Sequence, residues 1–403
     1  MNDLGLLRRD LGLSVTAPLA FETYQAFAQD TDRSGLTGDA KLEFLLLGLF
    51  GEIGSLLSEL KKKQRDKNAY FAYEWSAQEE AGDVLWYFAN VASYLDLSLT
   101  HVAAGVSPDG QLVHGETGRS IAKFVELERQ DSLFLEPASG EHVQRSLPRV
   151  AARAGRLVDR ATRGGDTPKR DLQIDLARIF DSFVSAAGDA QISLECAALL
   201  NMAKIYGRWP KEKDYGPLFD EEHDSDEQLP RHLCVTFREK PVNGKDYVFQ
   251  TVKGINLGDR LTDNSADKDD YRFHDVFHLA YAAILGWSPV LRALLRLKRK
   301  SKPSLDEEQD GARAIITEEG ISNWIFAHGL RHQSFAGVAS LDFSLLKTIQ
   351  QLVKGYEVEV RPLWMWEEAI LSGFAVFRQL TRHRGGVVTI DLCERTIVFE
   401  PPQ

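Results

Sequence analysis

The sequence predicts a mainly α-helical protein with an all-α N-terminal part and an α+β C-terminal domain that contains a small antiparallel sheet. Helical periodicity dominates residues 20–105 and resumes from about residue 118 to residue 208. Alternating, β-rich segments mark the start and end of the last region, at 232–239, 246–252, 386–392 and 395–400. A length of 403 residues leaves room for two or three domains. We expect them at 1–105, 118–215 and 230–403, with a glycine-rich interval at 105–118 between the first two.

The composition and net charge of the chain limit the classes of protein to which it can belong. Hydrophobic residues make up 43% of the chain and charged residues 27%, as in ordinary globular proteins. No apolar run reaches the length of a membrane span, and the N-terminus lacks a signal-peptide pattern. The cysteines are few, scattered and odd in number, which argues against a disulfide framework: Cys196, Cys234 and Cys393. We therefore expect a soluble, cytoplasmic protein without a membrane partner. A net charge of −11 disfavours nucleic acid as a partner but allows a small phosphate substrate.

Three acidic side chains interrupt two apolar helical segments near the N-terminus. Glu52 lies in GLFGEIGSLLSELKKK, and Glu80 and Asp83 lie in EEAGDVLWYFANVA. Residues three and four apart share a helix face, so each segment presents its acids as one stripe. Two facing stripes would form an oxygen cage that suits Mg²⁺, with Mn²⁺ as an alternative. The other interpretations are solvated helix faces or a structural network with the lysines at 61–63; the first fits poorly because the second segment is apolar over most of its circumference.

These segments, together with FETYQAFAQDT at 21–31, resemble the MazG-like, all-α nucleoside triphosphate pyrophosphohydrolases over about the first hundred residues. That family carries Glu-x-x-Glu on one helix and Glu-x-x-Asp on the next, and all four carboxylates bind Mg²⁺. Glu52, Glu80 and Asp83 match three of these positions. Ser55 stands where the family has a glutamate, and Glu59, one turn further on, is the candidate replacement.

The resemblance implies an enzyme that hydrolyses a nucleoside triphosphate to the monophosphate and pyrophosphate. Glu59 or Glu79 is then the candidate general base. Lys62 and Lys63 are candidates for binding the leaving pyrophosphate. Relatives usually form dimers or tetramers, so a homo-oligomer is one expectation; a second copy within the chain would make the pairing internal.

The region 118–215 reads as a degenerate second copy of the first. Leu97, Ser98 and Leu99 recur 95 positions later as Ile192, Ser193 and Leu194. On this register Glu80 falls on Asp175 and Asp83 on Arg178. With a slightly longer offset, at which Gly54 and Leu56 meet Gly155 and Leu157, Glu52 and Ser55 fall on Arg153 and Arg156, so most of the acids are replaced. The second copy is therefore not expected to bind Mg²⁺ in the same way.

The second copy ends in LNMAKIYGRWP, which resembles the Asn-x-x-Lys-x-x-x-Arg ending of many family members. Asn201, Lys204 and Arg208 offer donors for phosphate oxygens or a sugar hydroxyl. This favours a division of labour in which the first copy holds the metal and the second holds the nucleotide. In the alternative interpretation, the two cations simply favour a helix C-terminus.

The C-terminal region has its own candidate site. The charged segment 219–231 is expected to be a linker, and the sheet is expected to form from both ends of the region that follows. A basic run around Arg292 and Arg299 is interpreted as a solvated helix end. Within the helices, YRFHDVFHLAYAAILGW places His274 and His278 one turn apart, with Asp275 between them.

Two histidines at this spacing can ligate one metal, Zn²⁺ or another transition metal, with Glu318 or Glu319 supplied by a second helix. The competing interpretation is a pair of core histidines hydrogen-bonded to those glutamates. Two alternative functions therefore stay open. One is a nucleotide-binding sensor or regulatory protein with output through the C-terminal domain, and the other is a metal-dependent phosphohydrolase centred on His274 and His278.

Overall fold

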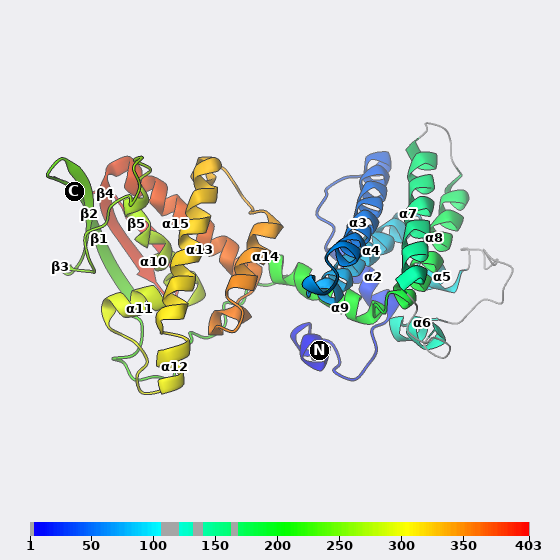
Figure 1. Cartoon of the computed structure of the whole chain (residues 1–403), viewed down its shortest axis with the longest axis horizontal. Helices are drawn as coiled ribbons and strands as arrows, with labels where there is room; N and C mark the ends of the chain where they lie inside the picture. Colours follow the sequence, from blue (N-terminus) through cyan, green and yellow to red (C-terminus); the bar gives the residue numbers. More distant parts are fainter. Residues whose placement is uncertain (1–3, 106–120, 132–139, 163–167, 403) are drawn as a thin grey trace. The chain divides into compact units, whose positions relative to one another are not determined.

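The computed structural model describes residues 4–105, 121–131, 140–162 and 168–402, so most of the predicted glycine-rich interval lies outside the described residues. The chain divides into two compact units, Met1–Trp209 and Pro210–Gln403 (Figure 1). Helices build the described part of the first unit, and the second combines helices with a five-stranded sheet. The predicted fold class, mainly α with an α+β C-terminal part, is confirmed.

One hydrophobic core joins the helices of the N-terminal unit. These are α1 (Leu4–Asp10), α2 (Phe21–Asp30), α3 (Gly38–Asp66), α4 (Tyr73–Tyr94), α5 (Leu99–Ala104), α6 (Phe124–Asp131), α7 (Gly140–Thr162), α8 (Lys169–Asp189) and α9 (Leu194–Arg208), with a 3₁₀ turn at Lys67–Ala69. Leu45, Leu49, Ile53 and Leu56 form the buried stripe of α3 at helical spacing. Helix α3 packs against α4 and α7, and α4 also packs against α9. The two halves of the unit therefore share a single core.

Two turns that the predicted internal repeat aligns have the same backbone conformation. Asp96 and Gln191, 95 positions apart, both adopt a φ of +56°. Two residues later, Ser98 and Ser193 cap the following helix, and each side chain accepts a hydrogen bond from the backbone N–H three residues on, at 3.1 and 3.2 Å. Helices α5 and α9 therefore begin in the same way.

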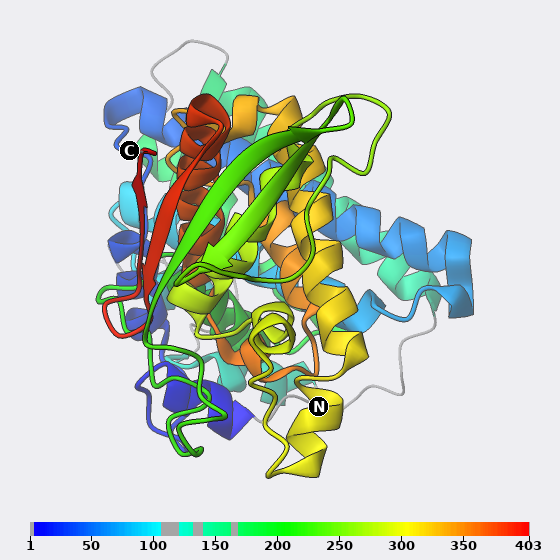
Figure 2. The same cartoon turned by 90° about the vertical axis from the view of Figure 1, so that its left-hand side faces the viewer.

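The sheet of the C-terminal unit is antiparallel, with the strand order β3-β2-β1-β4-β5. Its strands are β1 (His232–Val242), β2 (Lys245–Val252), β3 (Ile255–Asn256), β4 (Gly385–Asp391) and β5 (Thr396–Glu400). The unit's helices are α10 (Asp275–Leu285), α11 (Pro289–Leu295), α12 (Pro303–Glu308), α13 (Ala312–Arg331), α14 (Phe343–Leu352) and α15 (Leu363–His383), with 3₁₀ turns at Tyr271–Phe273, Gln333–Phe335 and Glu357–Val360. Helices α10 and α15 pack against each other and against β4 and β5, behind the sheet in Figure 2.

Buried ion pairs tie together the loops of this unit. Arg292, whose side chain is almost wholly buried, donates to Asp220 at 2.6 Å. Arg299 is equally buried and pairs with Asp310 and Glu357, each at 2.7 Å. The expectation that this basic run is solvated is therefore wrong for both arginines. The segment 219–231 belongs to the C-terminal unit and supplies Asp220 to its interior.

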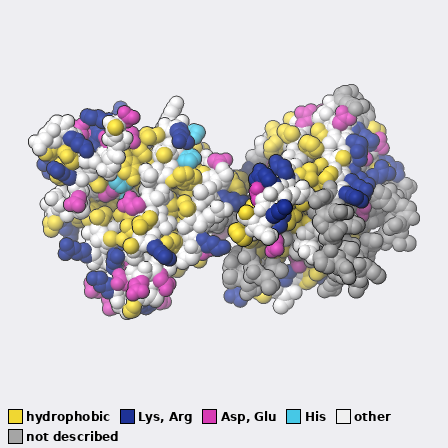
Figure 3. All heavy atoms as spheres, viewed as in Figure 1, with side chains coloured by type: hydrophobic (Ala, Val, Ile, Leu, Met, Phe, Trp, Pro, Cys, Tyr) yellow, Lys and Arg dark blue, Asp and Glu magenta, His cyan; other side chains and the backbone are white. Residues whose placement is uncertain are grey.

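Acidic, basic and hydrophobic side chains are interspersed on the face of the molecule in Figure 3. Among the described residues, no single helix combines the length and apolar character that crossing a membrane requires. The bent pairs α8–α9 and α10–α11 reach that threshold only when their two helices are counted together.

Candidate functional site

Helices α3 and α4 bring the three N-terminal acids together. Glu52 projects from α3, and Glu80 and Asp83 lie three residues apart on α4. One carboxylate oxygen from each lies within 4.8 Å of the other two. The helices approach closely at Gly48, where a β-carbon would lie 2.0 Å from the ring of Tyr87. The sequence spacing and this close packing together produce one acidic cluster, Glu52–Glu80–Asp83.

Helix α9 contributes two side chains to the cluster. Asn201 Nδ2 donates to Asp83 Oδ1 at 2.8 Å, and Lys204 Nζ pairs with both oxygens of Asp83. The close packing of α4 and α9 depends on Gly82, because a β-carbon there would lie 2.5 Å from the carbonyl oxygen of Ala197. The predicted second-copy residues thus meet the predicted metal ligands directly.

Tyr24 of α2 fixes the orientation of Asn201. Its buried hydroxyl donates to Asn201 Oδ1 at 2.9 Å and is 3.2 Å from the carbonyl oxygen of Gly82. Since Oδ1 of Asn201 accepts this bond, its Nδ2 faces Asp83. Tyr24, Asn201 and Lys204 therefore hold Asp83 in one position.

Burial and neighbouring negative charges raise the pKa values of the three carboxyl groups in the acidic cluster. Burial, reinforced by Asp83, Glu52 and Glu79, raises the pKa of Glu80 from 4.5 to about 7. Burial and the charge of Asp83 also raise the pKa of Glu52. Burial raises the pKa of Asp83 as well, although Lys204 opposes this. One lysine does not neutralise the group, so the site favours an additional cation.

Three other predicted residues lie in a neighbouring network. Glu59 is buried, accepts a hydrogen bond from the Tyr70 hydroxyl and pairs with Lys62 at 2.5 Å. Lys63 lies over the ring of Tyr73 at 5.7 Å. The structure does not place Glu59 in the acidic cluster, so it does not fill the position that Ser55 leaves without a carboxylate.

Arg208 lies one turn beyond Lys204 on α9. Its guanidinium is positioned over the ring of Trp209 at 4.6 Å. Of the three polar residues predicted on this helix, the structure therefore brings Asn201 and Lys204 to the acidic cluster and shows Arg208 against an aromatic ring.

Ion pairs lie at the positions of 140–189 that the predicted repeat aligns with the acidic cluster. Asp175 pairs with Arg160 at 2.8 Å and lies 4.0 Å from Arg178. Arg153 donates to the carbonyl oxygen of Arg178 at 3.0 Å and to the hydroxyl of Ser182. Arg160 and Arg178 therefore compensate the charge of Asp175, the predicted counterpart of Glu80.

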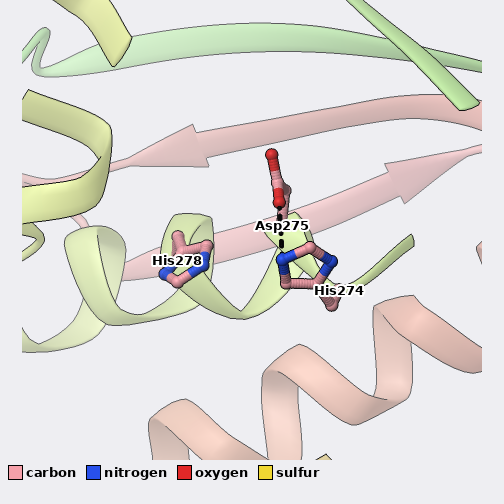
Figure 4. Close-up of side chains that lie close together, drawn as sticks. All are labelled: His274, Asp275 and His278. Atoms are coloured by element: carbon pink, nitrogen blue, oxygen red, sulfur yellow. Dashed lines mark ion pairs between the residues drawn. The ribbon is translucent and has the colours of Figure 1, made fainter. Parts of the chain in front are cut away.

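A second cluster lies in the C-terminal unit (Figure 4). His274 directly precedes α10, Asp275 begins the helix and His278 lies one turn further on. One potential ligand atom from each lies within 4.8 Å of the others. Glu319 of α13 also reaches them, with Oε2 3.5 Å from His278 Nε2 and 3.8 Å from His274 Nε2. Glu318 contacts the other side of the His278 ring, at Nδ1.

Several residues that shape the two clusters were not identified from the sequence. Tyr24 contacts Asn201, 177 positions away, and Gln250 contacts Asp275, 25 positions away, whereas Gly82 allows the close approach of Ala197 on α9. A glycine inside an otherwise apolar helix was a usable signal for Gly82, because it often marks close helix packing. A lone buried tyrosine or a strand glutamine gives no such signal.

Comparison with known proteins assigns the C-terminal unit to a family. Residues 214–403 match the MazG C-terminal domain. The Gene 37 protein of Mycobacterium phage L5 is 37% identical over 87 residues, which make up 20% of this chain and 76% of the phage protein. The chain therefore belongs to the family of this phage protein and carries a MazG C-terminal domain. No solved structure matches it. The MazG-like character of the first hundred residues stays a prediction, because the domain match begins at residue 214.

Proposed function

We propose that the chain is a Mg²⁺-dependent nucleoside triphosphate pyrophosphohydrolase whose site lies in the N-terminal unit. The observation that carries this proposal is the convergence of Glu52, Glu80 and Asp83 within 4.8 Å. The MazG C-terminal domain in the same chain supports it. The substrate is a nucleoside or deoxynucleoside triphosphate, cleaved to the monophosphate and pyrophosphate.

The donor set fits the cation. All three side chains offer carboxylate oxygens, which Mg²⁺ and Mn²⁺ prefer. Burial, together with the charges of neighbouring carboxylates, raises the pKa of Glu80, and a divalent cation would compensate that negative charge. Mg²⁺ held there supplies charge neutralisation for the phosphates and a more acidic water. Glu52, Glu80 and Asp83 would be its ligands.

The remaining polar groups have separate roles in this proposal. Lys204 pairs with Asp83 and lies 3.9 Å from Glu79, so its ammonium borders the region where phosphate oxygens would bind. Of the two candidate bases, Glu79 lies 3.9 Å from Lys204, which itself pairs with Asp83 of the acidic cluster. Glu59 instead accepts hydrogen bonds from Tyr70 and Lys62. We therefore assign proton acceptance to Glu79 and a structural role to Glu59.

The test is pyrophosphate release by the full chain from a panel of nucleoside and deoxynucleoside triphosphates with Mg²⁺. The double variant Glu80→Gln, Asp83→Asn should lose turnover. The matched control is Asp175→Asn, the second-copy counterpart of Glu80, which should keep it. Turnover that survives the double substitution would remove the proposal.

A nucleotide sensor is the second candidate function, and the Lys204–Asp83 ion pair is the observation that favours it. In this state a lysine already compensates one ligand, and Ser55 supplies no fourth carboxylate. A sensor would be stabilised thermally by a nucleotide without releasing pyrophosphate. The same substrate panel therefore separates the two functions.

A further inference from the structure

The two imidazoles of the C-terminal cluster are each anchored at Nδ1. His274 Nδ1 lies 2.9 Å from the carbonyl oxygen of Tyr271, and His278 Nδ1 lies 2.8 Å from Glu318 Oε1. Both partners are acceptors, so each Nδ1 carries the proton that it donates. In that tautomer Nε2 presents a lone pair, as in metal-bound histidines whose other nitrogen is held by a carbonyl or carboxylate.

The atoms around the two Nε2 nitrogens have the spacing of ligands that share one ion. Nε2 of His274 is 3.1 Å from Asp275 Oδ1 and 3.8 Å from Glu319 Oε2, and Nε2 of His278 is 3.5 Å from the same Glu319 oxygen. Bonds of about 2.0–2.2 Å from one tetrahedral ion place its ligands roughly 3.3 Å apart. The two longer separations exceed hydrogen-bond length but fit this arrangement.

His278 Nε2 has a second property that points to a ligand. The side chain is 1% exposed, and Nε2 has no hydrogen-bond partner. Leaving a buried polar atom of this kind without a partner is costly and uncommon. A cation between the two rings and Glu319 would complete its interactions.

The two neighbouring glutamates have different roles. Glu318 is fully buried, and its oxygens already accept hydrogen bonds from Ser288 Oγ at 2.7 Å and the Val290 N–H at 2.8 Å, besides the contact with His278. The described contacts of Glu319 include no hydrogen bond to the backbone, and its side chain is 42% exposed. Of the two, Glu319 is therefore the better placed to be a ligand, and Glu318 is placed to position the His278 ring.

Asp275 is oriented in a similar way. Its Oδ2 accepts a hydrogen bond from Gln250 Nε2 of β2 at 2.5 Å, which leaves Oδ1 toward His274. A strand and two helices thus converge on one point. Because the side chain of Glu319 is partly exposed, the cluster has a route by which an ion can enter from solvent.

We propose that the C-terminal unit binds one divalent transition-metal ion through Nε2 of His274 and His278, Glu319 Oε2 and Asp275 Oδ1. The mixed nitrogen and oxygen donors select Zn²⁺, Co²⁺, Fe²⁺ or Mn²⁺, in contrast to the oxygen-only cluster of the N-terminal unit. The site is independent of the proposed pyrophosphohydrolase activity.

The test uses the full chain carrying Glu80→Gln and Asp83→Asn, so that the N-terminal cluster does not contribute. After chelation and dialysis, the protein is titrated with Co²⁺, followed by visible absorption, and with Zn²⁺, followed by calorimetry. We expect one equivalent of each to bind, with Co²⁺ bands that Zn²⁺ abolishes. Protein that shows no saturable binding of either ion would overturn the proposal.

Two substitutions separate binding from folding. Glu319→Gln changes a partly exposed side chain and should lower the affinity for Zn²⁺ by at least about tenfold, and Glu318→Gln should lower it by about 10–100-fold through the His278 ring. Glu308→Gln on α12, an exposed position, is the matched control and should bind as the parent does. Affinity that is equal in the parent and Glu319→Gln would show that the ion binds elsewhere.

Discussion

Lys204 on α9 pairs with both carboxylate oxygens of Asp83 on α4, although 121 positions separate them in the chain. The ammonium group contacts the same oxygens that a divalent cation would use. Lysine and cation therefore compete for Asp83, and binding of one requires the other to move or to share the carboxylate. This pair links α4, which carries two of the proposed metal ligands, to α9, which carries the residues that the sequence assigned to nucleotide.

Replacement of Lys204 should separate cation binding from turnover. In Lys204→Met, the affinity for Mn²⁺ should rise because its competitor is gone, whereas kcat/KM for the nucleotide should fall about tenfold or more through loss of a charged donor. Electron paramagnetic resonance of free Mn²⁺ and pyrophosphate release measure the two effects. Lys169→Gln, which removes another lysine–aspartate pair of this unit, should change neither. Weaker Mn²⁺ binding in Lys204→Met would contradict the competition.

A methyl group at position 82 should push α9 away from α4. The β-carbon of Gly82→Ala would lie 2.5 Å from the backbone oxygen of Ala197, so the variant should lose about 1–3 kcal/mol of unfolding free energy and most of its turnover. Chemical denaturation and pyrophosphate release test this. Gly51→Ala on α3 is the control, because a β-carbon there meets nothing within 4 Å and should stabilise the helix by about 0.5–1 kcal/mol.

The hydroxyl of Tyr24 should act on catalysis through Asn201. Tyr24→Phe removes the donor to Asn201 Oδ1 and should cost about 1 kcal/mol of stability, with a fall in kcat larger than any change in KM. Asn201→Ala should lower kcat further. If the two side chains act as one unit, the double variant will be no worse than Asn201→Ala alone. Independent, additive losses would show that Tyr24 has only a packing role.

Lowering the pH should reduce the unfolding free energy of the C-terminal unit because Asp220 becomes protonated. Burial alone would raise the pKa of Asp220, but the hydrogen bond from the Leu229 N–H and the charges of Arg292 and Arg231 hold that pKa below its ordinary value. A depressed folded-state pKa contributes stability above the unfolded value of about 3.9, and this contribution disappears as the pH falls through the folded-state pKa.

Asp220→Asn should therefore lower the unfolding free energy at neutral pH by about 1.5–3 kcal/mol, since it removes the anion 2.6 Å from the buried Arg292 and leaves this arginine paired with Asp310 at 3.7 Å. The difference from the unsubstituted chain should shrink below about pH 4. Calorimetric Tm values between pH 3 and pH 7 check both statements. Asp224→Asn, at an exposed position in the same segment, should leave the profile unchanged.

Periodicity predicted much of the fold because it depends on local spacing. The stripe of Leu45, Leu49 and Ile53 identifies the buried face of α3, and the same spacing places Glu52 beside it. The alternation of apolar and polar residues likewise predicted the strands at the start and at the end of the C-terminal region. Ser98 and Ser193, which the predicted repeat aligns, cap their helices in the same way.

Long-range partners could not be predicted in the same way. A helix face does not specify which helix covers it, so the sequence assigned Lys204 to phosphate without revealing its pairing with Asp83. Glu318 and Glu319 are adjacent on α13, but Glu318 contacts Nδ1 of His278 and Glu319 lies near Nε2 of the same ring. The sequence alone does not distinguish these two positions. The basic run around Arg299 has the composition of a solvated surface, yet its partners, Asp310 and Glu357, lie beyond it in the chain and bury it.

The paired turns at Asp96 and Gln191 have an evolutionary consequence. When two identical subunits build a site, every substitution appears twice, and a change that helps one face can harm the other. A duplication carried on one polypeptide lifts that restriction. The predicted duplication would let one half keep Glu52, Glu80 and Asp83 while the other carries arginines at most of the aligned positions and supplies Lys204 to Asp83.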